Sequence, residues 1–119
     1  MPREATILTR VPLGLDHLVR LIDQSERPLG VQGIDRLGAA AILTPDGSLV
    51  CAIAQPALVS DPLEISRLCP SAAGQPVPCY WHDVRVGDAD PALARELLDD
   101  LAARCEGHLE LHGGARSAT

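Results

Sequence analysis

The stretch LGAAAILTPDGSLVCAIA, residues 37–54, contains two apolar runs on either side of the turn sequence PDG at 45–47. Proline presets φ for a turn, aspartate accepts a local hydrogen bond, and glycine tolerates the left-handed conformation. The pattern predicts a β-hairpin with arms at Leu37–Thr44 and Ser48–Ala54. Because both arms are apolar along nearly their whole length, we expect central strands that are covered on both faces.

Two aspartate–proline pairs downstream of this hairpin predict helix starts. Asp61 and Asp90 each precede a proline, and this order places an N-cap carboxylate before the first helical residue. Upstream, the spacing of apolar residues predicts another helix. The expected helices run from Leu15 to before Pro28, from Pro62 to Leu68, and from Pro91 to a stop at Gly107.

The remaining regular segments read as strands, in which successive residues point to opposite faces. We expect strands at Ala5–Val11, Cys79–Val86 and His108–His112, with an extra strand around Val31–Asp35. The sequence therefore predicts an α+β fold: one mixed, mainly antiparallel sheet of about five strands with two to three helices packed on it. We expect residues 1–119 to form a single compact domain in which 113–119 are a frayed tail.

The composition excludes several classes of function. The chain has no lysine, so all ten basic residues are arginine, and the formal net charge is −6. Schiff-base and phosphate-loop chemistry that needs lysine is excluded, and scattered arginines among excess acid argue against nucleic-acid binding. Because we find no export signal or membrane span, we expect a cytoplasmic protein without a membrane partner, whose cysteines are thiols or metal ligands.

Two Cys-x-x-His pairs, Cys79–His82 and Cys105–His108, suggest a zinc site, with His112 as a substitute ligand. Two considerations weaken this alternative. Residues three apart on a strand point to opposite faces, so Cys79 and His82 cannot bind the same ion unless the strand starts after His82. Cys105 also completes the apolar stripe of its helix, where a cysteine packs as a small hydrophobic residue.

His108, Glu110 and His112 occupy alternate positions of the last expected strand, so they share one face. Two imidazoles beside a carboxylate can bind a transition metal or transfer protons. The same pattern fits the solvated face of an edge strand, which charge protects from aggregation. We favour the solvated face and keep His108 and His112 as candidate metal ligands. Zinc is the one cofactor considered, and none is expected.

A small cysteine-dependent enzyme is the other alternative. Cys79 stands near His82 and is the best candidate nucleophile, because a catalytic thiolate needs a base or a cation close by. No third residue at a recognisable spacing orients this pair. The nucleophile-elbow, dinucleotide-binding and metalloprotease motifs do not occur in the chain. We therefore lean away from an enzyme.

The only tyrosine and the only tryptophan, Tyr80 and Trp81, follow a loop at 70–78 that contains several prolines. Prolines reduce the entropy that a loop loses on binding, and Tyr and Trp are enriched in binding hot spots. We favour a non-catalytic regulatory or accessory domain, a homodimer, that binds a small ligand or a protein through Cys69–His82. The expected contact residues are Cys79, Tyr80, Trp81 and His82.

Overall fold

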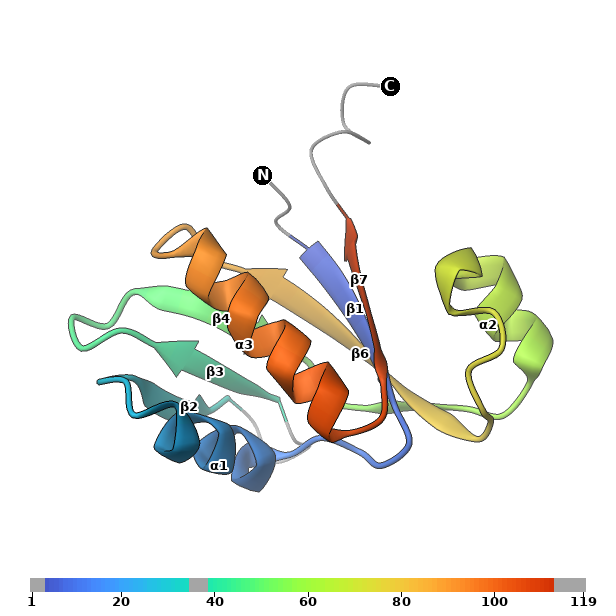
Figure 1. Ribbon diagram of the computed structural model, residues 1–119, viewed down its shortest axis with the longest axis horizontal. Coiled ribbons are helices and arrows are strands. Elements are labelled where there is room, and N and C mark those ends of the chain that lie inside the picture. Colours follow the sequence, from blue (N-terminus) through green and yellow to red (C-terminus); the bar gives the residue numbers. More distant parts are fainter. Residues whose placement is uncertain (1–3, 35–38, 113–119) are drawn as a thin grey trace.

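The computed structural model describes residues 4–34 and 39–112 (Figure 1). Both predicted N-caps are confirmed: the Asp61 carboxylate accepts a hydrogen bond from the Leu63 N–H at 2.9 Å, and Asp90 accepts one from the Leu93 N–H at 3.0 Å. In chain order the elements are β1 (Glu4–Thr9), α1 (Leu15–Ser25), β2 (Gly30–Gly33), β3 (Ala40–Leu43), β4 (Leu49–Ile53), β5 (Ala57–Val59), α2 (Pro62–Leu68), the 3-10 turn η1 (Pro70–Ala72), β6 (Cys79–Val86), α3 (Pro91–Arg104) and β7 (His108–His112).

The strands form one sheet in the order β2-β3-β4-β6-β1-β7, and the pairings of the described strands are all antiparallel. The eight-residue strand β6 pairs with β1 along one edge and with both β4 and β5 along the other. The α+β class is thus confirmed, with seven strands instead of about five and an antiparallel rather than mixed sheet. Strand β2 overlaps the strand expected around Val31–Asp35 but ends at Gly33, and residue 35 lies outside the described residues. Three-residue β5 is too short to show alternation.

The predicted hairpin is present, with β3 and β4 as its arms. Gly47 in its turn has a φ of 88°, in the left-handed region that favours glycine. Residues 37 and 38 of the expected first arm, like the expected tail at 113–119, lie outside the described residues. Cys51 on one face of β4 is fully buried, but Ala52 on the other face is only half-buried. Ala41 of β3, which lies on the same face as Ala52, is buried, so cover on both faces is present on β3 and incomplete on β4.

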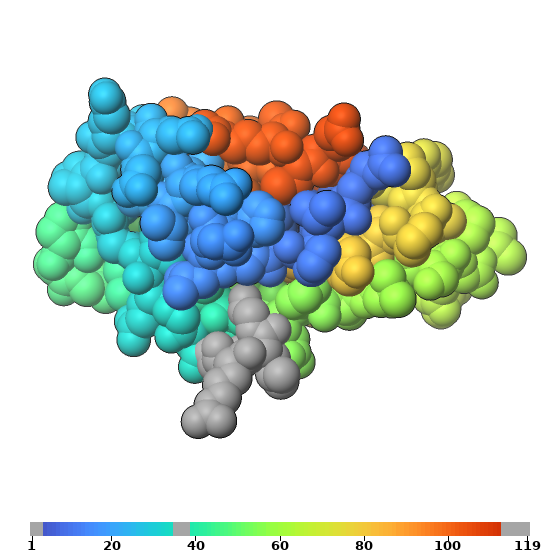
Figure 2. Space-filling view, turned by 90° about the horizontal axis from the view of Figure 1, so that it is seen from below, coloured from blue at the N-terminus to red at the C-terminus, as the bar shows by residue number. Residues whose placement is uncertain are grey.

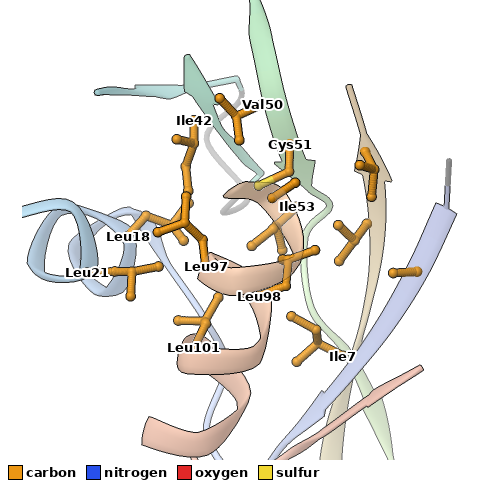
Figure 3. Packing of buried hydrophobic residues seen from close by; sticks show 14 of the residues in the cluster. Ile7, Leu18, Leu21, Ile42, Val50, Cys51, Ile53, Leu97, Leu98 and Leu101 are labelled. Carbon is orange, nitrogen blue, oxygen red and sulfur yellow. The ribbon is translucent and has the colours of Figure 1, made fainter. Parts of the chain in front are cut away.

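Helices α1 and α3 lie over one face of the sheet, which we call the helix face (Figure 1). Leucines of both helices meet aliphatic side chains of the strands there, and together they form the larger buried cluster. The chain has no phenylalanine, so aliphatic residues fill this core. Figure 3 labels Ile7, Leu18, Leu21, Ile42, Val50, Cys51, Ile53, Leu97, Leu98 and Leu101 from this cluster.

On the opposite face, which we call the open face, the described residues provide cover only at one end. There α2 and η1 form a second buried cluster with β1 and β6, which we call the α2 cluster. Figure 2 shows the segment that contains α2 and η1, coloured green to yellow, at one end of the molecule. The buried members of the α2 cluster are Leu8, Ile65, Cys69, Ala72 and Cys79.

Helix α3 ends at Arg104, shortly before the predicted stop at Gly107. Glu106, with a φ of 50°, takes the left-handed position after the helix. Gly107 is required for close approach, because a Cβ there would lie 2.2 Å from the backbone oxygen of Leu8. At 14 residues α3 is the longest described helix, and none of the described helices is long and apolar enough to cross a membrane.

Candidate functional site

The pairing register arranges the side chains of the open face in rows that cross the strands. The first row contains Ala52, Arg85, Glu4 and His112, from β4, β6, β1 and β7. The second row contains Asp83, Thr6 and Glu110. The third row contains Trp81, Leu8 and His108, and it lies at the α2 end because Leu8 belongs to the α2 cluster. The face therefore changes from apolar beside α2 to charged in the first row.

A groove with a volume of about 580 Å³ lies over the charged end of the open face. Small-ligand sites typically enclose roughly 300–1,000 Å³, so a small molecule fits this groove. Ala52 and Ala54 contribute only methyl groups to it, which leaves space beside the charged side chains. Its described lining consists of Glu4, Ala5, Ile34, Ala39, Ala52, Ile53, Ala54, Asp83, Val84, Arg85 and His112.

Side chains of both charges line this groove. Arg85 is exposed, and its guanidinium makes no ion pair or hydrogen bond among the described residues. Glu4 stands directly opposite Arg85 in the register without pairing with it. Asp83, two residues before Arg85 on β6, accepts a hydrogen bond from Trp81 Nε1–H at 2.9 Å on its Oδ1. The groove thus presents an unpaired guanidinium and a carboxylate that a tryptophan holds in place.

A cluster of four polar side chains joins η1 to β7 near the α2 end of the face. Cys69 Sγ donates to Glu110 Oε2 at 2.8 Å, and Ser71 Oγ lies 2.9 Å from both Glu110 Oε1 and His108 Nε2. The hydrogen bond from Cys69 is the main cause that lowers the pKa of Glu110, and Ser71 lowers this pKa further. Burial raises the pKa of the Cys69 thiol, and Glu110 adds to that rise. Cys69 is therefore a protonated donor and Glu110 an ionised acceptor.

The proton arrangement in this cluster follows from the charge on Glu110. An ionised carboxylate only accepts, so the Ser71 hydroxyl donates its single proton to Glu110. The Ser71 oxygen must then accept a hydrogen bond from His108 Nε2–H. His108 is a donor to the serine rather than a base that removes its proton, which serine nucleophiles require. The cluster is built to hold β7 against η1.

Strand β6 places the four predicted contact residues on its two faces. Cys79 is buried in the α2 cluster, and Trp81 packs against that cluster on the open face. Tyr80, which is half-buried, and His82 alternate with them, so they point toward the helix face. The four side chains therefore do not meet at one site, and only Trp81 reaches the groove region through its bond to Asp83.

His82 is fully buried near the connection between β1 and α1. Its Nε2 accepts a hydrogen bond from the Leu13 N–H at 3.4 Å and lies 3.2 Å from Thr9 Oγ1. Within the described part of the chain Nδ1 has no hydrogen-bond partner. Burial lowers the pKa of His82 to about 4. At neutral pH this imidazole is an uncharged core residue.

The five residues considered as zinc ligands are not brought together. Across residues 4–34 and 39–112, no group of three or more His, Cys, Asp or Glu side chains is placed to hold a metal ion. Cys105 packs against the helix-face core, whereas Cys79 lies in the α2 cluster. On the open face His108 is bonded to Ser71 and His112 to Thr6. All four cysteines are free thiols.

Sequence reasoning missed the groove residues Glu4, Asp83 and Arg85. Alternation along β6 places Asp83 and Arg85 on the same face as Trp81, so the sequence could have indicated that these three side chains lie together. Glu4 joins them only because β1 pairs with β6 across more than seventy residues of chain. Nothing local in the sequence reports such a pairing.

Comparisons with known proteins do not add to this geometry. No protein-family model matches the chain, and neither a curated protein nor a solved structure matches it.

Proposed function

We propose that this chain is a non-catalytic ligand-binding domain whose small ligand occupies the groove of the open face. The unpaired Arg85 guanidinium inside a groove of about 580 Å³ is the observation that carries the proposal. A guanidinium presents a rigid fork of N–H donors, which suits recognition of a carboxylate or phosphate group. A regulatory or accessory role suits a domain that binds without transforming its ligand.

The state of the thiols and imidazoles supports binding over catalysis. Burial raises the pKa of both Cys69 and Cys79, so neither is poised as a thiolate. His108 donates to Ser71, and His82 is enclosed by the core. These contacts favour structural roles for the residues that a cysteine or serine enzyme would employ.

In this proposal the segment Cys69–His82 supports the groove rather than contacting the ligand. Trp81 holds the Asp83 carboxylate, and Cys69 and Ser71 brace Glu110 on β7, two residues before His112. The aromatic side chain remains important, but its effect on binding passes through Asp83.

The test is to fill the groove without changing its charges. Ala52→Phe places a ring beside Arg85, and Ala103→Phe on the exposed side of α3 is the matched control. Ligand-observed NMR against a library of small polar metabolites should yield compounds that bind the native chain and the control. These compounds should lose binding to Ala52→Phe while circular dichroism shows that the variant is folded. Equal binding to both variants would remove the groove as the site.

We also propose that the protein is cytoplasmic, forms a homodimer, and does not bind nucleic acid. The net charge of −6 supports the last point, because nucleic-acid binding needs a clustered basic surface. Light scattering coupled to size-exclusion chromatography tests the dimer, and a monomer mass across micromolar concentrations would rule it out.

A further inference from the structure

We infer that the groove selects a small zwitterion, a molecule that carries one carboxylate and one ammonium group. Free amino acids and their longer ω-amino homologues belong to this class. The inference rests on the proposed function, because it names the ligand class of the same groove. Three charged side chains of the groove, Arg85, Asp83 and Glu4, determine this selectivity.

Arg85 is the site for the ligand carboxylate. It is the single arginine among the described groove residues, and its guanidinium has no partner among them. A carboxylate can accept two parallel N–H hydrogen bonds from this group. Glu4 stands opposite on β1 without an ion pair to Arg85, and an exposed contact of this kind is weak, so a ligand carboxylate can compete with Glu4 for the guanidinium.

Asp83 is the site for the ligand ammonium group. Trp81 Nε1–H occupies Oδ1 of this carboxylate at 2.9 Å and leaves Oδ2 available to accept from a ligand. Trp81 is itself packed against the α2 cluster, so the orientation of Asp83 is supported from the protein interior. A carboxylate that is already oriented loses less entropy when it binds a cation.

The balance of charge in the groove also favours a ligand that carries an ammonium group. Glu4 and Asp83 together carry two negative charges against the one positive charge of Arg85. Arg85 is the only cation among these three residues. When it binds a ligand carboxylate, neither Glu4 nor Asp83 has a positive charge from this set to offset its own. A ligand that also brings an ammonium group offsets them, whereas a simple acid does not.

The spacing on β6 suits a short ligand. Asp83 and Arg85 are two residues apart on one face, which corresponds to roughly 6.6 Å along a strand. A molecule whose two charged groups are separated by a few bonds can therefore reach both side chains. The methyl groups of Ala52 and Ala54 leave room for its carbon atoms.

The experiment compares three classes of probe by calorimetry and NMR on the full chain. Glycine, β-alanine, γ-aminobutyrate and leucine are the zwitterions, propionate is the acid and propylamine is the amine. At least one zwitterion should bind roughly ten-fold or more tightly than either single-charge probe. Equal affinity for propionate, or no zwitterion binding at millimolar concentration, would overturn the inference. The Ala52→Phe comparison uses any compound that binds the native chain. It therefore tests the groove as the binding site whether or not the ligand is a zwitterion.

Matched variants test which residue binds each charged group of the ligand. Arg85→Gln should weaken zwitterion binding by roughly ten- to hundred-fold, and Asp83→Asn should do the same while its amide oxygen still accepts from Trp81. Arg95→Gln on α3, which breaks only the exposed pair with Asp99, is the control and should change nothing. Unchanged affinity in both groove variants would contradict the assignment.

Trp81→Phe tests the positioning of Asp83. This variant replaces the indole by a smaller aromatic ring and removes the N–H that holds the carboxylate. Zwitterion binding should weaken while propionate binding at Arg85 stays the same. A general loss of structure would weaken both, so the difference between the two probes isolates the positioning role.

Discussion

At the scale of single residues, His82 looks like a ligand in the sequence and is a core residue in the structure. In the sequence it follows Cys79 at a spacing that zinc sites use. In the fold it points away from Cys79 and accepts a hydrogen bond from Leu13 at the connection between β1 and α1. An imidazole buried in its neutral form ties protein stability to pH.

The free energy of unfolding should decrease as the pH falls from about 6.5 to about 4. In this window the unfolded chain protonates His82, whose ordinary pKa is 6.5, while the folded chain, with a pKa of about 4, does not. The unfolded state then binds more protons, so the loss approaches about 3 kcal/mol at pH 4 and levels off below it. At neutral pH and above, this contribution is constant.

Urea denaturation of the native chain and of His82→Gln between pH 7.5 and 4.5 measures this effect. The variant should be less stable at pH 7.5 but should lose much less stability on acidification. Glu110 has a lowered pKa, so its own contribution to stability is lost mainly below its ordinary value of 4.5, which is below the pH range of this measurement. Parallel pH profiles for the two proteins would show that His82 is not the titrating group.

The four thiols should differ in reactivity according to their burial. Cys105 is the only one of them that is not fully buried, and Arg104 partly offsets the rise in its pKa that burial causes. Burial raises the pKa of Cys51 to about 12. Iodoacetamide at pH 8, followed by peptide mass spectrometry, should therefore modify Cys105 first and Cys51 last. Faster modification of Cys79 would favour the cysteine-enzyme alternative over a binding domain.

At the scale of elements, the junction between α3 and β7 depends on a missing side chain. A Cβ on Gly107 would lie 2.2 Å from the Leu8 backbone oxygen, a contact that cannot be relieved by moving a side chain. Gly107→Ala should destabilise the protein by about 2 kcal/mol, because β7 must shift away from β1. Gly30→Ala meets nothing within 4 Å and should change stability by less than about 0.5 kcal/mol. Thermal unfolding of both variants checks this, and similar melting temperatures would refute it.

Elements with local signals could be predicted from the sequence. The Pro-Asp-Gly turn and the Asp61 and Asp90 caps all act within a few residues, and each is present in the structure. Strand β5 could not be predicted, because its three residues form a strand only by pairing with Tyr80 and its neighbours on β6. Its ordering comes from a partner that is about twenty residues away.

At the scale of the whole molecule, the candidate site was the least predictable feature. The sequence directs attention to Cys69–His82, and the structure assigns much of that segment to the α2 cluster and the cluster at Glu110. The groove instead combines residues of β1, β4, β6 and β7. Alternation along β6 places Asp83 and Arg85 on one face, but only the pairing order brings Glu4 and His112 beside them.

That strand order also determines when the groove can exist. Its residues come from both ends of the described chain, since Glu4 stands opposite His112 in the register. A partly folded chain, or one still being synthesised, therefore lacks a complete binding surface. A ligand in the groove would bind only the finished fold and would shift the unfolding equilibrium toward it by mass action. A bound ligand would then indicate that β7 has paired with β1 and that the sheet is fully formed.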